Sequence, residues 1–133
     1  MTKILSPKAH GYLDFVVVAT FLLAPSLFNF TGLPVTLSCI IAVAHLGMTL
    51  FTRFPMGLVK LIPFPVHGTL ELVASIALIL APYLFSFREQ SSALWFYTIA
   101  AVVIFGVWAT TDYKAVSASI GQRRDLFALK RAS

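Results

Sequence analysis

The sequence predicts an all-α integral membrane protein, a four-helix bundle made of two parallel two-helix repeats and followed by a basic amphipathic C-terminal segment. Hydrophobic residues make up 59% of the 133 residues and charged residues only 11%, against about 45–50% and about 25% in soluble proteins. The apolar residues gather in four runs, each about as long as a helix needs to cross a bilayer. Residues 10–30 and 67–87 also align without a gap at an offset of 57, with 10 identities in 21 positions.

The four apolar runs define the expected membrane-spanning helices. A soluble fold with so few charges would expose large apolar patches, and a bilayer would cover them. A cleavable signal peptide is the alternative for the first run. However, Asp14 interrupts that run, and the same stretch recurs in mid-chain. We therefore expect helices over residues 13–28, 35–51, 70–87 and 93–109.

The internal match indicates a single membrane domain over residues 1–133 that is built from two similar units. We expect the first repeat over residues 10–54, the second over 67–113 and a tail over 114–133. Because a repeat with an even number of spans keeps its orientation, the two units should be parallel and related by a pseudo-twofold axis along the membrane normal. Matching residues would then lie at the same depth.

Small and rigid residues recur at matching places in the two units. Pro25 and Pro82 fall near the outer ends of the first and third helices. Proline lacks a backbone donor and clashes with the preceding turn, so these helices should kink or end there. Gly11 and Gly68 should let helix backbones approach closely where they cross.

The basic residues predict the orientation in the membrane. Nine of the ten Lys and Arg residues fall on one side of the predicted helices, and only Arg88 falls on the other. The positive-inside rule assigns the basic side to the cytoplasm. We therefore expect both termini in the cytoplasm, with the protein in the bacterial inner membrane and the lipid bilayer as its partner.

The basic tail has two possible forms. Its apolar residues alternate with bases, which predicts an amphipathic helix on the inner membrane surface, and a frayed tail is the alternative. The net charge of +5 does not indicate nucleic-acid binding, because the bases lie close to the helix ends. Four helices leave little room for a pathway inside one chain, so a homodimer is also considered.

Two matching pairs of ionisable residues are the candidate site. His10 precedes Asp14 by four positions, and His67 precedes Glu71 by four, so each pair shares one helix face. Ionisable groups in membrane segments usually face the bundle interior and find a partner. The two pairs could form a pocket open to the cytoplasm that holds a divalent metal or passes protons. Alternatively, each acid only complements the helix dipole and each histidine is its local partner.

His45 lies well inside the second predicted helix and has no counterpart in the fourth. A neutral imidazole bonded to a neighbouring group, such as Thr49 or an acid, is the ordinary state of such a residue. Haem ligation would need a second axial ligand at the same depth, and His10 and His67 are expected closer to the inner edge. Cys39 is the single cysteine, so no internal disulfide can form.

Several segments resemble the SPW-repeat family of small bacterial membrane proteins. The similarity covers most of residues 10–113 and is carried by Thr52-Arg53-Phe54, Gly57-Leu58-Val59-Lys60, Ile62-Pro63, His67, Leu70-Glu71 and Leu80-Ala81-Pro82-Tyr83-Leu84-Phe85. The family's Ser-Pro-Trp motif is replaced by Ala24-Pro25-Ser26 and Ala81-Pro82-Tyr83, so only the proline matches. The resemblance implies a two-unit, four-helix membrane protein, and it implies no particular biochemical activity.

The sequence does not resemble that of an enzyme. It has no Gly-rich phosphate loop, no paired cysteines and no serine flanked by glycines at a nucleophile turn. We expect a non-enzymatic binding, transport or accessory module with a His/carboxylate pocket near the cytoplasmic face. The alternatives are a structural or oligomeric membrane subunit without a ligand and, less favoured, a haem or metal redox protein. No particular cofactor or metal is indicated.

Overall fold

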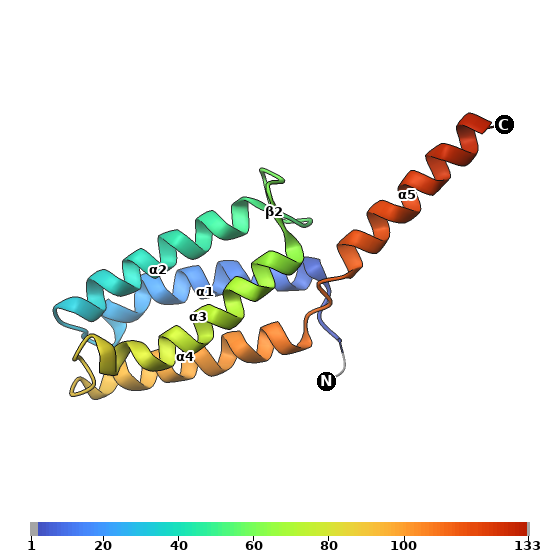
Figure 1. Cartoon of the computed structure of the whole chain (residues 1–133). Helices are drawn as coiled ribbons and strands as arrows, with labels where there is room; N and C mark the ends of the chain where they lie inside the picture. Colours follow the sequence, from blue (N-terminus) through green and yellow to red (C-terminus); the bar gives the residue numbers. More distant parts are fainter. Residues whose placement is uncertain (1–2, 133) are drawn as a thin grey trace.

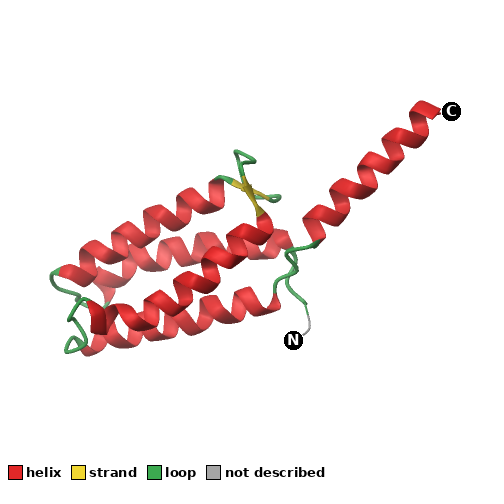
Figure 2. Cartoon of the chain, viewed as in Figure 1, coloured by secondary structure: helices red, strands yellow, loops and turns green. Residues whose placement is uncertain are grey.

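The computed structural model describes residues 3–132, and most of them are helical. Four helices lie side by side in a bundle, and a fifth extends away from one end of it (Figure 1). They are α1 (Pro7–Leu27), α2 (Leu33–Leu50), α3 (Phe64–Leu84), α4 (Ser91–Thr110) and α5 (Ala115–Ala132). Two short strands, β1 (Thr52–Arg53) and β2 (Ile62–Pro63), pair in parallel between α2 and α3 at the end from which α5 projects (Figure 2).

The bundle helices are the four expected apolar helices. With 21, 18, 21 and 20 residues, α1 to α4 are long and apolar enough to cross a membrane. However, α1 and α3 begin at Pro7 and Phe64, six residues before the predicted starts at positions 13 and 70. Proline is favoured in the first turn of a helix, and Pro7 and Pro65 occupy that turn. Ser6 also caps α1, because its side chain accepts a hydrogen bond from the Ala9 amide. The histidines therefore lie inside the helices.

The prolines near the end of the bundle opposite α5 mark where α1 and α3 stop. Pro25 and Pro82 are each followed by two more helical residues. A residue with positive φ then reverses the chain, Asn29 at 53° and Ser86 at 57°. Of the two expectations for these prolines, ending the helix is the one the structure bears out.

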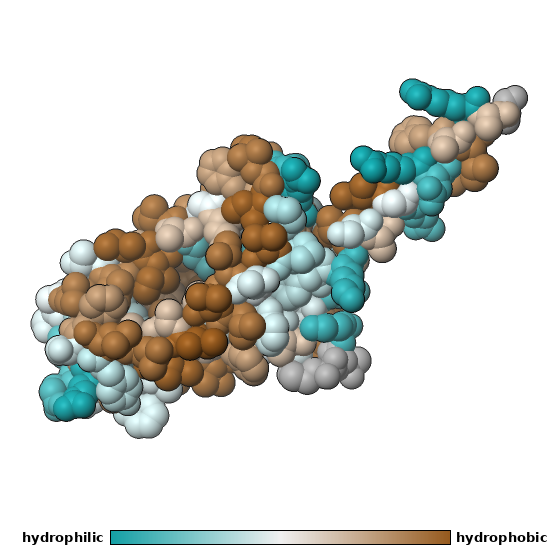
Figure 3. All heavy atoms as spheres, viewed as in Figure 1, coloured by the Kyte–Doolittle hydropathy of each residue, from teal (hydrophilic) through white to brown (hydrophobic). Residues whose placement is uncertain are grey.

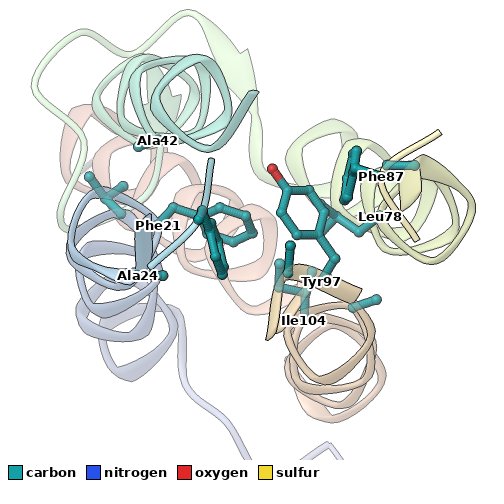
Figure 4. Packing of buried hydrophobic residues seen from close by; sticks show 12 residues of the cluster. Phe21, Ala24, Ala42, Leu78, Phe87, Tyr97 and Ile104 are labelled. Carbon is teal, nitrogen blue, oxygen red and sulfur yellow. The ribbon is translucent and has the colours of Figure 1, made fainter. Parts of the chain in front are cut away.

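The core of the bundle is an aromatic cluster. Each helix packs mainly against its sequence neighbour, α1 against α2 and α3 against α4. Phe21 and Tyr97 fill the space between these two hairpins (Figure 4), with ring centroids 5.9 Å apart. The Tyr97 hydroxyl lies 3.0 Å from Ser38 Oγ, which satisfies the buried phenol. At the end of the bundle opposite α5, the side-chain amide of Gln90 bonds the Thr31 backbone through both its oxygen and its nitrogen, at 3.0 and 2.9 Å.

The outside of the bundle is as apolar as its core. Val16, Val43, Val73 and Val102 are each more than half exposed, at 58 to 68%. Apolar residues dominate the face of the bundle in Figure 3, and hydrophilic residues gather towards its ends and along α5. α5 has no buried residue. Of the two forms expected for the tail, the described residues adopt the helix.

Candidate metal centre

The structure brings the two predicted His/acid pairs together inside the bundle. His10 and Asp14 lie on α1, and His67 and Glu71 lie on α3, near the end of the bundle from which α5 projects (Figure 1). Each offers a ligand atom, a ring nitrogen or a carboxylate oxygen, and these four atoms lie within 4.8 Å of one another. All four residues are at most 2% exposed. We call these four residues the histidine–carboxylate cluster.

Each imidazole contacts the other imidazole and both carboxylates. His10 Nε2 lies 3.3 Å from His67 Nε2, 3.2 Å from Asp14 Oδ1 and 3.4 Å from Glu71 Oε2. His67 Nε2 lies 3.5 Å from Asp14 Oδ2 and 3.7 Å from Glu71 Oε1. Each histidine therefore pairs with the acid of its own helix and with the acid of the other helix, so local pairing alone does not describe the cluster.

Two threonines at helix ends set the tautomers of the histidines. The Thr52 hydroxyl lies 2.6 Å from the Met48 carbonyl and 2.8 Å from His67 Nδ1. A hydroxyl has one hydrogen to donate, and the carbonyl can only accept it. The Thr52 oxygen therefore accepts a hydrogen bond from His67 Nδ1–H. In the neutral ring this leaves the lone pair on Nε2, which faces the cluster.

The same arrangement occurs at His10. The Thr111 hydroxyl donates to the Val107 carbonyl at 2.6 Å and accepts from His10 Nδ1 at 2.9 Å. Thr52 and Thr111 are both fully buried. When both rings are neutral, two Nε2 lone pairs therefore face each other across 3.3 Å, an arrangement that needs a proton or a cation between them.

The carboxylates are held by hydroxyl donors. Thr49 donates to Asp14 Oδ2 at 3.1 Å, and Tyr113 donates to Glu71 Oε2 at 2.6 Å. Burial, and then the Glu71 carboxylate, raise the pKa of the Tyr113 hydroxyl, so this phenol stays protonated and remains a donor. The ion pairs of Asp14 and Glu71 within the described residues are all with histidines.

Aromatic rings close the site at the end of the bundle, so the expected pocket open to the cytoplasm is not present. The rings of Phe54 and Phe64 stack with centroids 5.2 Å apart, and Phe64 lies edge-on to His10 at 5.3 Å. Tyr113 packs against Phe64 at 4.8 Å. The linker between α2 and α3 folds back here, since β1 and β2 pair and bring Phe54 and Phe64 over the imidazoles.

The two glycines at matching positions, Gly11 and Gly68, leave space for the aromatic rings that close the site rather than for a crossing of helix backbones. A Cβ on Gly68 would lie 2.6 Å from the Tyr113 ring, and a Cβ on Gly11 would lie 2.7 Å from the Phe54 ring. Both distances are too short for real atoms. Gly11 and Gly68 therefore make room for the aromatic residues that follow α2 and α4, and the expectation of close backbone contact between helices is corrected.

His45 on α2 borders the histidine–carboxylate cluster. Its Nε2 is buried without a hydrogen-bond partner among the described residues and lies 3.6 Å from Asp14 Oδ1. Its ring centroid is 6.3 Å from that of His67. The expectation that His45 is well separated in depth from the other histidines is wrong, because His10 and His67 lie inside their helices rather than ahead of them.

Comparisons of this chain with protein-family models, with curated proteins and with solved structures found no match. The chemistry of the site is therefore judged on its geometry.

The sequence reasoning missed the residues that orient the site, which are Thr49, Thr52, Thr111 and Tyr113. A signal for three of them was present, because Thr52-Arg53-Phe54 matches Thr111-Asp112-Tyr113 at an offset of 59. In the structure each threonine bonds the histidine of the other unit, Thr52 with His67 and Thr111 with His10. A repeated threonine beside a repeated histidine could have suggested this exchange.

Proposed function

We propose that this chain is an integral membrane protein that binds a divalent transition-metal ion in the histidine–carboxylate cluster, as a non-enzymatic binding or transport module. The observation that carries the proposal is the pair of Nε2 atoms 3.3 Å apart beside two carboxylates. Zn²⁺ binds such ligands at about 2.0–2.1 Å, which places tetrahedral ligands about 3.3 Å from one another. The contacts of His10 within the cluster measure 3.2 to 3.4 Å.

Charge supports a divalent cation. With both imidazoles neutral, the buried carboxylates of Asp14 and Glu71 give the cluster a charge of −2, and uncompensated buried charge is costly. A divalent ion balances this charge. Imidazole nitrogen favours zinc, copper, iron and nickel over magnesium and calcium, so the mixed donor set favours a transition metal.

Two other readings of the cluster are less well supported. Protonated histidines would also balance the acids, would donate from Nδ1 to Thr52 and Thr111 equally well, and would describe a ligand-free structural subunit or a proton relay. The short spacing of the four donor groups favours the metal over this alternative. A haem between His10 and His67 is not favoured, because their Nε2 atoms lie only 3.3 Å apart and a porphyrin does not fit between them.

We also propose that the chain spans a membrane and consists of two parallel repeats. The exposed apolar faces of α1 to α4 support insertion into a bilayer. The bases at one end support a bacterial inner-membrane location with both termini in the cytoplasm. The exchanged threonine–histidine bonds support two parallel repeats over residues 10–54 and 67–113, as the resemblance to SPW-repeat proteins implies. A homodimer and the absence of nucleic-acid binding stay predictions.

Metal analysis of the detergent-purified protein tests the proposal. We expect about one transition-metal ion per chain, and we expect Co²⁺ added to the stripped protein to produce the visible absorption of a site with nitrogen and oxygen ligands. Asp14→Asn combined with Glu71→Gln should abolish both signals while the protein still inserts. Glu89→Gln is the control, because Glu89 is 88% exposed at the opposite end. If wild-type protein binds no ion, the metal assignment is wrong. A loss of stability in the double variant would then indicate a structural role.

A further inference from the structure

A second polar feature lies outside the bundle, at the same end of the molecule. A cavity of about 430 Å³ separates the 53–60 linker from the beginning of α5, within the range of about 300–1,000 Å³ that is usual for ligand sites. Its polar lining includes the side chains of Arg53, Lys60 and Arg123. Its apolar lining includes Phe54, Val116 and Ile120, and no carboxylate lines it.

Within residues 3–132, the three cations have no carboxylate partner. Arg53 Nε donates to the Lys60 carbonyl at 2.7 Å. Lys60 Nζ donates to the carbonyls of Gly57, at 2.8 Å, and of Phe54. Arg123 makes no hydrogen bond or ion pair with the described residues. Carbonyl partners orient Arg53 and Lys60 but do not neutralise them, so the cavity is a site of concentrated positive charge.

The surroundings of the cavity match the surface of a membrane. The linker beside it exposes large apolar side chains, Leu58 at 77% and Leu61 at 61%. On α5, helical spacing puts Val116, Ile120 and Phe127 in one stripe. The bases Arg123, Arg124, Lys130 and Arg131 flank that stripe on both sides, and Asp125 falls on the opposite face. This pattern is typical of helices that lie at an anionic membrane surface.

We propose that the cavity binds the phosphate headgroup of an anionic phospholipid. Arg53, Lys60 and Arg123 would contact the phosphate, since guanidinium and ammonium groups form strong charge-assisted bonds with phosphate oxygens. Phe54, Val116 and Ile120 would contact the glycerol and the upper acyl chain. Basic pockets beside membrane helices on the cytoplasmic side are the usual setting for such headgroups. This inference does not depend on a metal in the histidine–carboxylate cluster.

Lipid retention tests the site. The protein is reconstituted in nanodiscs of equal parts phosphatidylglycerol and phosphatidylcholine and released for native mass spectrometry. We expect the wild type to retain phosphatidylglycerol preferentially. Arg123→Gln should reduce that preference roughly tenfold, the effect of losing one charged hydrogen bond. The variant should fold normally, because the Arg123 side chain makes no hydrogen bond or ion pair within the described chain.

Arg124→Gln is the matched control, since Arg124 is the adjacent base and is not among the residues lining the cavity. It should keep the wild-type preference. An equal loss in both variants would overturn the site and indicate only a general attraction of α5 to anionic lipid. A third arm adds millimolar inorganic phosphate to the nanodiscs. Unchanged retention supports the lipid, whereas displacement of the lipid from wild-type protein would overturn the assignment in favour of a soluble phosphate ligand.

Discussion

At the scale of single residues, the geometry of the histidine–carboxylate cluster depends on the side chains that form hydrogen bonds with its histidines. Metal-binding histidines usually donate their second ring N–H to an outer partner that fixes tautomer and orientation. Thr52 and Thr111 have this role here, because each hydroxyl gives its hydrogen to a helix carbonyl and can only accept from the imidazole. The hydroxyl proton thereby leaves Nε2 of each neutral histidine as the nitrogen that would bind the proposed metal.

Replacing Thr111 with valine should therefore weaken metal binding. Thr111→Val keeps the shape of the side chain but leaves His10 Nδ1–H without its acceptor, and losing such an outer partner typically costs about 10–100-fold in metal affinity. Competition with a chromophoric chelator measures the affinity. Thr110→Val is the control, because the Thr110 hydroxyl bonds only backbone carbonyls of its own helix. Equal affinity in Thr111→Val and the wild type would show that the hydroxyl does not set the tautomer.

The sequence could predict the ligands but not these outer partners. His10, Asp14, His67 and Glu71 stand out because ionisable residues are rare in apolar helices and because the pairs repeat at an offset of 57. A threonine at the end of an apolar helix is ordinary. Its role follows only from a contact between positions 101 residues apart, Thr111 and His10. Sequence spacing within one helix cannot reveal such a contact.

At the scale of elements, hydropathy predicted which segments are helices but misplaced where two of them begin. The first two turns of α1 and α3 contain proline, glycine, histidine and an acid, which interrupt the apolar pattern without preventing a helix. The linker between α2 and α3 was harder to predict. Its pairing of Thr52 with Ile62 and of Arg53 with Pro63 bends the chain back over the bundle. That bend turns an expected open pocket into a closed site.

The fit between α3 and the segment after α4 can be tested at Gly68. Gly68→Ala should destabilise the protein by about 1–3 kcal/mol, the usual cost of overpacking, because its Cβ would lie 2.6 Å from the half-buried Tyr113 ring. Thermal unfolding in detergent measures the change. Gly106→Ala provides the control, since no atom lies within 4 Å of a Cβ there, and alanine is the better helix former by about 1 kcal/mol. Equal melting temperatures in the two variants would mean that the Tyr113 ring moves aside at no cost.

At the scale of the whole molecule, apolar surface and charge are arranged along one axis. The sides of the bundle expose valine, leucine and isoleucine, whereas nine of the ten bases lie towards the end where α2 stops and α5 begins. The bundle and the apolar character of its four helices followed from composition and run length alone. The prediction that the two hairpins meet around a polar centre also depended on the repeat, because residues at matching positions of two parallel units should lie at the same depth. The direct contact between the two hairpins through Thr31 and Gln90, at the end opposite α5, could not be predicted, since nothing in the sequence distinguishes these two residues from others in the turns.

This arrangement predicts a fixed topology that cysteine labelling can check. In a Cys39→Ser background, Ser91→Cys places a single thiol at the first residue of α4, and Ser117→Cys places one near the start of α5. Both positions are exposed. Because nine of the ten bases lie on the α5 side and positive charge is retained in the cytoplasm, a membrane-impermeant maleimide should label S91C in intact cells and S117C only after lysis.

Labelling of S117C in intact cells would show that the orientation is inverted, and the basic cavity beside α5 would then face the outer leaflet. Labelling of both single-cysteine variants before lysis would mean that the apolar bundle does not separate the two ends, and a membrane-spanning arrangement would be wrong.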